Sequence, residues 1–343
     1  TECGRCDAVC PAALTKKPLH PKKVLHDLKL NLRYENWPTI KKNYTLFGDI
    51  KNGLEKELEN LEFPTSLISI DKNIAQSSDG SYDLHGQIHL DDIWSCTTCA
   101  ACVDVCPVLI DSVPTSLIEM RRNLVMMQAD NYPKELNSSF RGMEVQSNPW
   151  GVGADKREDW ALGLDVPLMR DKQKVEYLFF VGCAGATDER AKKIQQALVR
   201  ILKKANVDFA ILGCEEKCTG DPARRMGNEY LFDTMAKENI EVLNNYNFKK
   251  IFTACPHCFN SLKNEYKDFG TNYSVQHHTE LINELLKDGR LNADLKKEIS
   301  EKVTFHDPCY LGRYNNVYDA PRELLKQAGN EIVEMDKIGR AHV

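Results

Sequence analysis

A repeated cysteine motif is the feature that most constrains this chain. The complete copy reads Cys96-x2-Cys99-x2-Cys102-x3-Cys106-Pro107. The other copy lacks only its first cysteine and reads Cys3-x2-Cys6-x3-Cys10-Pro11. Three thiolates, each separated from the next by two intervening residues, can surround one iron–sulfur cubane. A fourth thiolate just before proline points instead to a companion cluster. The repeat therefore predicts a fold built around two [4Fe–4S] clusters.

Each predicted cluster takes ligands from both copies of the motif. One cluster would be held by Cys96, Cys99, Cys102 and Cys10. The other would be held by Cys3, Cys6, Cys106 and the absent cysteine. Zinc sites or disulfides are the alternative, but zinc needs no repeated triplet closed by Cys-Pro. The motif thus predicts a protein that transfers electrons.

Both ends of the sequence suggest a piece of a longer protein. The chain has no initiator Met and opens inside a motif, at Thr1. Residues 338–343 do not continue any pattern of the preceding sequence, and we interpret them as a translated sequencing adapter rather than as protein sequence.

Composition narrows the class of protein. With 343 residues, 42% of them hydrophobic, the chain can hold two or three soluble domains. A net charge of −5 argues against a nucleic-acid partner, which requires a concentrated positive surface. Thirteen cysteines grouped in Cys-x-x-Cys units favour metal over disulfides and hence a reducing compartment. No apolar stretch of about 20 residues is present to span a bilayer.

The pattern of apolar residues predicts an α+β multidomain protein. Residues 1–130 are predicted to form a helical, ferredoxin-like dicluster domain, with helices over 51–61 and 116–128. Residues 131–174 show no periodicity and are expected to form an extended linker, or else a loop packed on the dicluster domain. From residue 175, strands and helices alternate, which favours an α/β domain with a parallel sheet. The expected strands are 177–181, 207–212, 250–254 and 303–305, and the expected helices are 191–204, 230–244, 259–267 and 278–287.

A second group of cysteines follows the predicted strands. Cys183 follows the first strand, Cys218 the second, and Cys255 and Cys258 the third. The carboxyl ends of parallel strands lie at one edge of a sheet, which is where open α/β sheets bind ligands. Four thiolates at that edge predict a third iron–sulfur cluster.

The same residues carry a family resemblance. The strings Gly182-Cys183, Cys218-Thr219-Gly220 and Cys255-x-x-Cys258 resemble the cysteine-rich CCG domain of heterodisulfide reductases and related iron–sulfur oxidoreductases. Members usually carry two such units, so 175–302 would be the first unit and 303–337 the start of a second, with Cys309 as its first cysteine.

Local strings within 218–228, 255–260 and 306–313 are similar to the membrane-linked branch of this family. That resemblance implies an electron transfer flavoprotein–menaquinone oxidoreductase. Electron transfer flavoprotein or another flavoprotein would be the donor, and menaquinone the acceptor. An N-terminal membrane domain with haem b, absent from this sequence, would hold the protein at the cytoplasmic face of the cell membrane.

One departure from the family pattern matters for the chemistry. Thr219 stands where the family has the second cysteine of a pair used by non-cubane clusters that cleave disulfides. The four cysteines that remain suffice for a cubane. Cys214 is a fifth candidate ligand, although we expect a buried structural thiol. A heterodisulfide or thiol reductase is thus one alternative function, and a non-catalytic relay subunit of a glycolate or lactate-type dehydrogenase is another.

Charged residues near these cysteines suggest how a cluster could be tuned. Asp221 followed by Pro222 is typical of a helix N-cap and first turn. That helix could aim Arg224 and Arg225 at cluster sulfurs or a bound anion, the alternative being ion pairs at the surface. His257, between two predicted ligands, could act on the cluster or simply face solvent.

Overall fold

The computed structural model describes residues 3–35, 66–71, 73–82, 84, 86–128, 131–291 and 301–335. Within it the chain forms two compact units that divide between Asn123 and Leu124. The predicted helix over 51–61 and the segment 338–343 lie outside the described residues.

The first unit is mostly helical and carries both cysteine motifs. A short parallel pair of strands joins Ile68 to Ile88 and Ser69 to His89. The helix expected over 116–128 is confirmed and begins four residues earlier, at Ser112. The elements are 3-10 helix η1 (Asp7–Val9), α1 (Pro11–Leu14), α2 (Pro21–Glu35), β1 (Ile68–Ser69), β2 (Ile88–His89), α5 (Leu90–Ser95), α6 (Ala101–Asp104) and α7 (Ser112–Met127).

The second unit contains a four-stranded parallel sheet of order β4-β3-β5-β6, which confirms the predicted α/β architecture. The strands are β3 (Lys174–Phe179), β4 (Phe209–Ile211), β5 (Asn247–Thr253) and β6 (Val275–His277). The sequence did not predict β6, because three residues are too short a run for periodicity to reveal. The connecting helices are α10 (Cys183–Thr187), α11 (Glu189–Lys204), η3 (Gly213–Glu215), α12 (Asp221–Arg225), α13 (Glu229–Asn244), α14 (Pro256–Asn260) and α15 (His278–Lys287).

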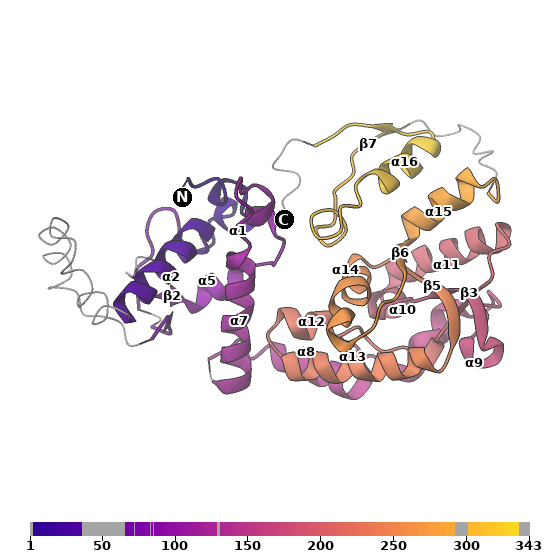
Figure 1. Ribbon diagram of the computed structural model, residues 1–343, viewed down its shortest axis with the longest axis horizontal. Coiled ribbons are helices and arrows are strands. Elements are labelled where there is room, and N and C mark those ends of the chain that lie inside the picture. Colours follow the sequence, from indigo (N-terminus) through magenta and orange to yellow (C-terminus); the bar gives the residue numbers. More distant parts are fainter. Residues whose placement is uncertain are drawn as a thin grey trace, which may run out of the picture. The chain divides into compact units, whose positions relative to one another are not determined.

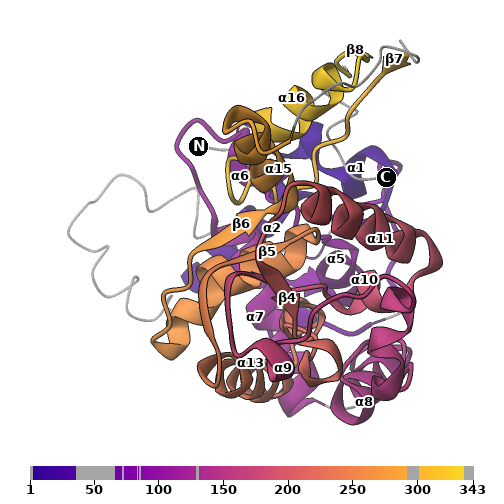
Figure 2. The same ribbon diagram turned by 90° about the vertical axis from the view of Figure 1, so that its right-hand side faces the viewer.

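Helices cover both faces of this sheet, as Figures 1 and 2 show. Alternate residues of β3 explain the two cores, because successive side chains of a strand point to opposite faces. Leu178 packs with α13 on one face, while Phe179 stacks on Phe252 of β5 (ring centroids 4.6 Å apart) and faces α11 and α15. The loops that carry Cys183, Cys218, Cys255 and Cys258 therefore extend from a sheet that is buried on both faces.

The prediction of an extended linker over 131–174 is wrong. This segment contains α8 (Leu136–Gln146), the 3-10 helix η2 (Ala154–Ala161) and α9 (Met169–Lys172). It does not follow the alternative either, because its buried residues belong to the cores of the second unit. Phe140 and Met143 pack on one face of the sheet, and Trp160 packs on the other. Tertiary packing rather than local periodicity stabilises these short helices.

Residues 301–335 form the last described part of the second unit. The strand expected at 303–305 overlaps β7 (Lys302–Val303) at Val303 alone, and β7 pairs in parallel with β8 (Glu331–Ile332). Between them lies α16 (Asp319–Gln327), whose Arg322 makes a bidentate ion pair with Asp307 at 2.7 and 2.8 Å.

Candidate iron–sulfur sites

Four cysteines from the two motif copies line one small cavity in the first unit. The structure brings Cys10 of the first copy to the three close-spaced cysteines of the second, Cys96, Cys99 and Cys102. This is the set that the crossed arrangement requires for one cubane. A donor set of four thiols in a partly enclosed, mostly apolar pocket fits an iron–sulfur cluster in its chemistry.

The backbone of the second motif curls around this cavity in an unusual conformation. Thr98 and Ala100 both lie in the left-handed region, with φ of 54° and 56°. The turn aims the Thr98 N–H at Cys96 Sγ, 3.3 Å away. In the first copy, Gly4 occupies the position of Ala100 and also has positive φ, 75°. Because non-glycine residues pay a steric cost in this region, the loop shape must be enforced by its surroundings.

A buried arginine fastens this loop to α7. Arg121, 5% exposed, donates hydrogen bonds to the carbonyl oxygens of Ile93 and Cys96. Its guanidinium lies 5.1 Å from the ring centroid of Trp94. Arg121 therefore places a fixed positive charge next to a candidate ligand.

The thiols of the first unit differ in their electrostatic surroundings. Burial raises the pKa of Cys10 to about 11 and that of Cys102 to about 12. Backbone N–H groups after Cys106 instead lower its pKa. Cys3 is exposed and Cys6 half-buried. Binding of a cluster must therefore displace protons from the buried thiols, so assembly is coupled to proton release.

The second group of cysteines lies where the sequence predicted, at the carboxyl ends of β3, β4 and β5. Cys183 Sγ and Cys218 Sγ are 3.8 Å apart. On the third loop, the Cys258 N–H is directed at Cys255 Sγ at 3.5 Å. These thiols influence one another electrostatically: hydrogen bonds from Cys258 lower the pKa of Cys255, whereas the Cys255 thiolate raises that of Cys258. The four sulfurs thus converge on one site.

Gly182 leaves room for this convergence. Its φ is 78°, and a Cβ there would lie 3.2 Å from Cys258 Sγ and 3.7 Å from Cys255 Cβ. A side chain at this position would fill the space where the cysteine loops meet. Glycine is therefore favoured before Cys183 for two reasons. A side chain would not fit there, and the positive φ disfavours other residues.

Thr219 is part of the same site. It is 1% exposed, and its hydroxyl lies 4.0 Å from Cys258 Sγ. Tyr266 donates a hydrogen bond to the Thr219 carbonyl at 3.1 Å, and Asn239 donates one to the Cys218 carbonyl at 2.9 Å. Two buried side chains thus fix the loop that presents Cys218.

Sequence reasoning missed a buried ion pair behind these cysteines. Arg157 of η2 and Glu216 are each 2% exposed and lie 2.8 Å apart. Glu216 also accepts hydrogen bonds from the N–H groups of Val181 and Gly182, both at 2.8 Å. One carboxylate therefore joins the loop before Cys183 to the end of η3 before Cys218. In the sequence, Arg157 stands in a run of charged residues just before Trp160. Such a run is more typical of a solvated surface than of a buried ion pair.

Of the two roles that the sequence left open for Arg224 and Arg225, cluster tuning and ion pairing, the structure shows ion pairs. Arg224 lies 3.2 Å from Asp268 and stacks over the Phe232 ring. Arg225 donates to Asp221 at 3.1 Å.

The predicted cap at the start of α12 is also wrong. Gly220 is the N-cap, with φ of 82°, and Asp221 is the first helical residue. The Asp221 carboxylate pairs with His257 Nδ1 at 2.8 Å. Burial lowers the pKa of His257, but the hydrogen bond and charge of Asp221 outweigh burial and the pKa is raised. His257 also packs against Tyr310, so it is not simply a solvated loop residue.

The expected burial of Cys214 is wrong. This residue is exposed, and its Sγ lies 3.7 Å from the carbonyl oxygen of Asp155.

Cys309 is buried, 6% exposed, in the segment that precedes α16. Its neighbour Tyr310 provides the ring that contacts His257.

Single-ion chelation does not describe these sites. Within the described ranges, no three His, Cys, Asp or Glu side chains are grouped to hold one metal ion. Ligands of a cubane each bind a different iron, so they need to surround a volume rather than meet at a point.

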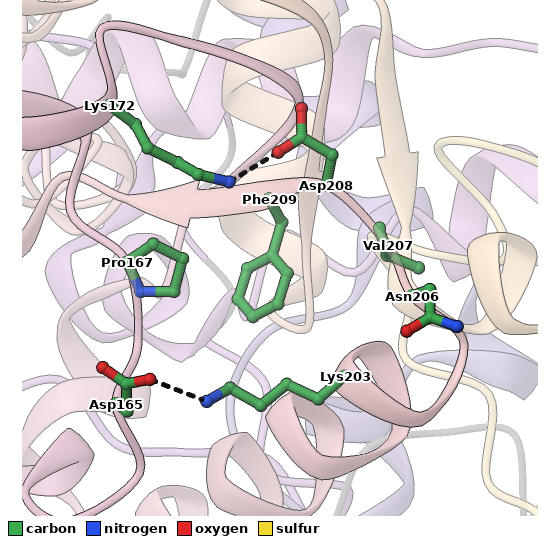
Figure 3. Close-up of a pocket in the computed structure, with 8 residues that line it drawn as sticks. All are labelled: Asp165, Pro167, Lys172, Lys203, Asn206, Val207, Asp208 and Phe209. Carbon is green, nitrogen blue, oxygen red and sulfur yellow. Dashed lines mark hydrogen bonds and ion pairs between the residues drawn. The ribbon is translucent and has the colours of Figure 1, made fainter.

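A separate, open pocket of about 440 Å³ lies at the amino ends of β3 and β4, away from the cysteines (Figure 3). Its lysines are paired, Lys172 with Asp208 at 2.6 Å and Lys203 with Asp165 at 3.7 Å.

Comparisons with known proteins agree with this division. Residues 1–107 match the 4Fe-4S dicluster domain, and residues 177–263 and 303–342 match the cysteine-rich domain. The chain is 42% identical over 341 residues to the EtfAB:quinone oxidoreductase of Syntrophomonas wolfei, covering 98% of this chain and 45% of that protein. It is 36% identical over 343 residues to a probable membrane-anchored ferredoxin of Chromohalobacter salexigens, covering 98% of this chain and 48% of that protein.

A third relative is a subunit of the dihydromethanophenazine:CoB–CoM heterodisulfide reductase of Methanosarcina mazei. It is 32% identical over 256 residues, covering 72% of this chain and 60% of that protein. The chain thus spans about half the length of the first two curated relatives. No solved structure matched it. None of the helices described here is long and apolar enough to cross a membrane.

Proposed function

Because the chain belongs to the heterodisulfide reductase-related family of iron–sulfur proteins, with a dicluster and a cysteine-rich domain, we propose that it carries electrons between a flavoprotein and membrane quinone. Electron transfer flavoprotein is the proposed donor and menaquinone the acceptor. The similarity to a quinone oxidoreductase over 98% of this chain supports this assignment.

Three clusters would form the electron path. Two [4Fe–4S] clusters in the dicluster domain take the cysteines of the two motifs. A third is held by Cys183, Cys218, Cys255 and Cys258, whose sulfurs gather at one sheet edge. The clusters supply one-electron chemistry, and the protein supplies buried thiols, N–H donors and positive charge. Cys309 would begin a further unit of the same kind.

The observation that carries the proposal is Thr219. A buried hydroxyl occupies the place beside Cys218 where a disulfide-cleaving site needs a fifth thiolate. Four thiolates suit a cubane that passes electrons on. The similarity to a heterodisulfide reductase subunit keeps disulfide reduction as the second candidate, with any such chemistry assigned to a second unit.

Membrane attachment is part of the proposal. The relative named as a probable membrane-anchored ferredoxin supports an anchoring domain outside this sequence. We propose that this domain carries haem b and places the clusters at the cytoplasmic face.

The test uses the full-length protein in lipid vesicles that contain menaquinone. Electron transfer flavoprotein, reduced by an acyl-CoA dehydrogenase and its substrate, should be reoxidised with reduction of the quinone. The Cys255→Ser variant should lose this activity, whereas Cys214→Ser should retain it. Reduction of a heterodisulfide by the full-length protein, without quinone reduction, would overturn the proposal in favour of the second candidate.

A further inference from the structure

The buried Arg157–Glu216 pair is more than the fold alone requires. Burying two charges is costly, and a well-packed apolar pair often serves stability as well. Here both side chains are 2% exposed, and the arginine comes from η2, which is neither a strand nor a cysteine loop. The pair therefore calls for a role beyond packing.

Glu216 alone accounts for the structural part of that role. Its two carboxylate oxygens accept the N–H groups of Val181 and Gly182. This positions the loop that starts at Cys183. Two residues after Glu216 comes Cys218, whose own N–H donates to the carbonyl of Ser147.

Arg157 is not fully used by this arrangement. Its Nη2 donates to Glu216, but its Nη1 is buried and has no hydrogen-bond partner within the described residues. A buried donor without an acceptor is costly, so such a group generally serves a ligand or water. The charge is also close to the candidate ligands. Glu216, which binds the guanidinium, accepts the N–H of Gly182 directly before Cys183 and lies two residues before Cys218. Burial acts to lower the pKa of Arg157, but the charge of Glu216 and its hydrogen bond act to raise it.

We propose that Arg157 is a positioning residue for the third cluster, with its guanidinium fixed by Glu216 and its free Nη1 donating toward the sulfurs at the Cys183–Cys218 side. This inference rests on the proposed cluster at these cysteines. A fixed positive charge and a hydrogen bond to sulfur both stabilise the reduced, more negative cluster, and they raise its reduction potential. Arg157 would thereby make this site a better electron acceptor.

The test is an EPR-monitored redox titration of the full-length protein, prepared anaerobically. The signal of the third cluster is identified as the one lost in Cys183→Ser. In Arg157→Gln its midpoint potential should shift to more negative values, while the dicluster signals stay unchanged. Arg157→Lys, which keeps the charge, should shift it less.

The matched control is Arg170→Gln. Arg170 also pairs with a glutamate, Glu158, at 2.9 and 3.2 Å, but at the surface. It should leave all midpoint potentials unchanged. An unshifted potential in Arg157→Gln with full iron content would overturn the role of Arg157 and leave the cluster assignment standing. If wild-type protein shows no signal that Cys183→Ser removes, the cluster assignment fails and the role fails with it.

A second measurement covers the case in which Arg157→Gln does not keep the cluster. Wild-type protein labelled with ¹⁵N-arginine should show a ¹⁵N hyperfine coupling in pulsed EPR of the reduced third cluster. Its absence in wild type would overturn the proposal.

Discussion

Cys183 and Cys218, which are 35 residues apart in the chain, place their sulfurs 3.8 Å apart at the carboxyl ends of neighbouring parallel strands. The register of β3 and β4 fixes this approach, because Phe179 is directly opposite Ile211. Both cysteines are buried beyond these strand ends, Cys183 at 8% and Cys218 at 1% exposed.

The first prediction concerns the ligands of the third cluster. Cys183→Ser and Cys218→Ser should each lower the iron content of anaerobically prepared protein by about four atoms per chain, since each removes a ligand of the same cubane. The double variant should lose no more than either single one. Cys214→Ser, at an exposed cysteine close in sequence, is the control and should retain all iron. A loss of iron in the control would make Cys214 a ligand.

The second prediction tests crossed ligation in the dicluster domain. Because Cys10 lines the cavity of Cys96, Cys99 and Cys102, Cys10→Ser should damage the cluster of the second motif. EPR of this variant should resemble that of Cys99→Ser rather than that of Cys6→Ser. The opposite resemblance would show that each motif holds its own cluster.

The third prediction isolates the steric role of Gly182. Gly182→Ala should lose the third cluster, because the new Cβ would meet Cys258 Sγ at 3.2 Å. Gly289→Ala is a matched control, since Gly289 also has positive φ, 70°, but nothing lies within 4 Å of its Cβ position. Gly289→Ala should lower the free energy of unfolding by about 1–2 kcal/mol, the cost of left-handed backbone, measured by urea unfolding. Gly182 combines its positive φ with ψ of 155°, a region almost confined to glycine, so Gly182→Ala should cost about 1–3 kcal/mol. Only Gly182→Ala should lose iron, and retention of all iron would contradict the steric argument.

The fourth prediction concerns the strained loop at Ala100. Replacing this residue by glycine relieves the left-handed conformation but adds chain entropy to the unfolded state. We expect Ala100→Gly to raise the free energy of unfolding by about 0.5–1 kcal/mol, measured by anaerobic urea titration. Ala101→Gly, in the adjacent helical residue, should lower it by about 1 kcal/mol. Equal effects of both changes would argue against strain at Ala100.

The fifth prediction is a loss of stability in mild acid. Burial lowers the pKa of His277 to about 2 and that of His278 to about 4. An unfolded histidine titrates near pH 6.5, so the unfolded chain takes up protons first as the pH falls. The contribution of the neutral histidines to the free energy of unfolding is therefore complete above pH 6.5 and falls progressively as the pH drops below that value. His277 alone should account for about 1.4 kcal/mol between pH 7.5 and 5.5.

Circular dichroism during urea unfolding at both pH values measures this loss. His277→Asn retains a residue type that caps α15 but removes the titrating group, so its stability should depend less on pH. An unchanged dependence would assign the acid effect to other groups.

The sequence revealed the parts of this protein that obey local rules. Cysteines placed after apolar runs predicted one sheet edge, because parallel strands must end together. It did not reveal Arg157, because the partner Glu216 is 59 residues away and only the fold joins them. It did not reveal α8 or η2 either, since their buried residues, such as Phe140 and Trp160, pack against a sheet formed later in the chain. For Arg225 the sequence left cluster tuning and ion pairing open, and the structure shows an ion pair with Asp221, four residues earlier in the chain.

The cavity shared by Cys10 and Cys96 has a consequence for biosynthesis. The two motifs are separated by residues 11–95, so a ribosome releases Cys10 long before the other residues of that cavity. The pocket exists only after Cys102 has emerged. A cluster held by these four cysteines could therefore assemble only after most of the first unit had been translated, and a nascent chain stalled before Cys96 would expose Cys10 without the other three ligands.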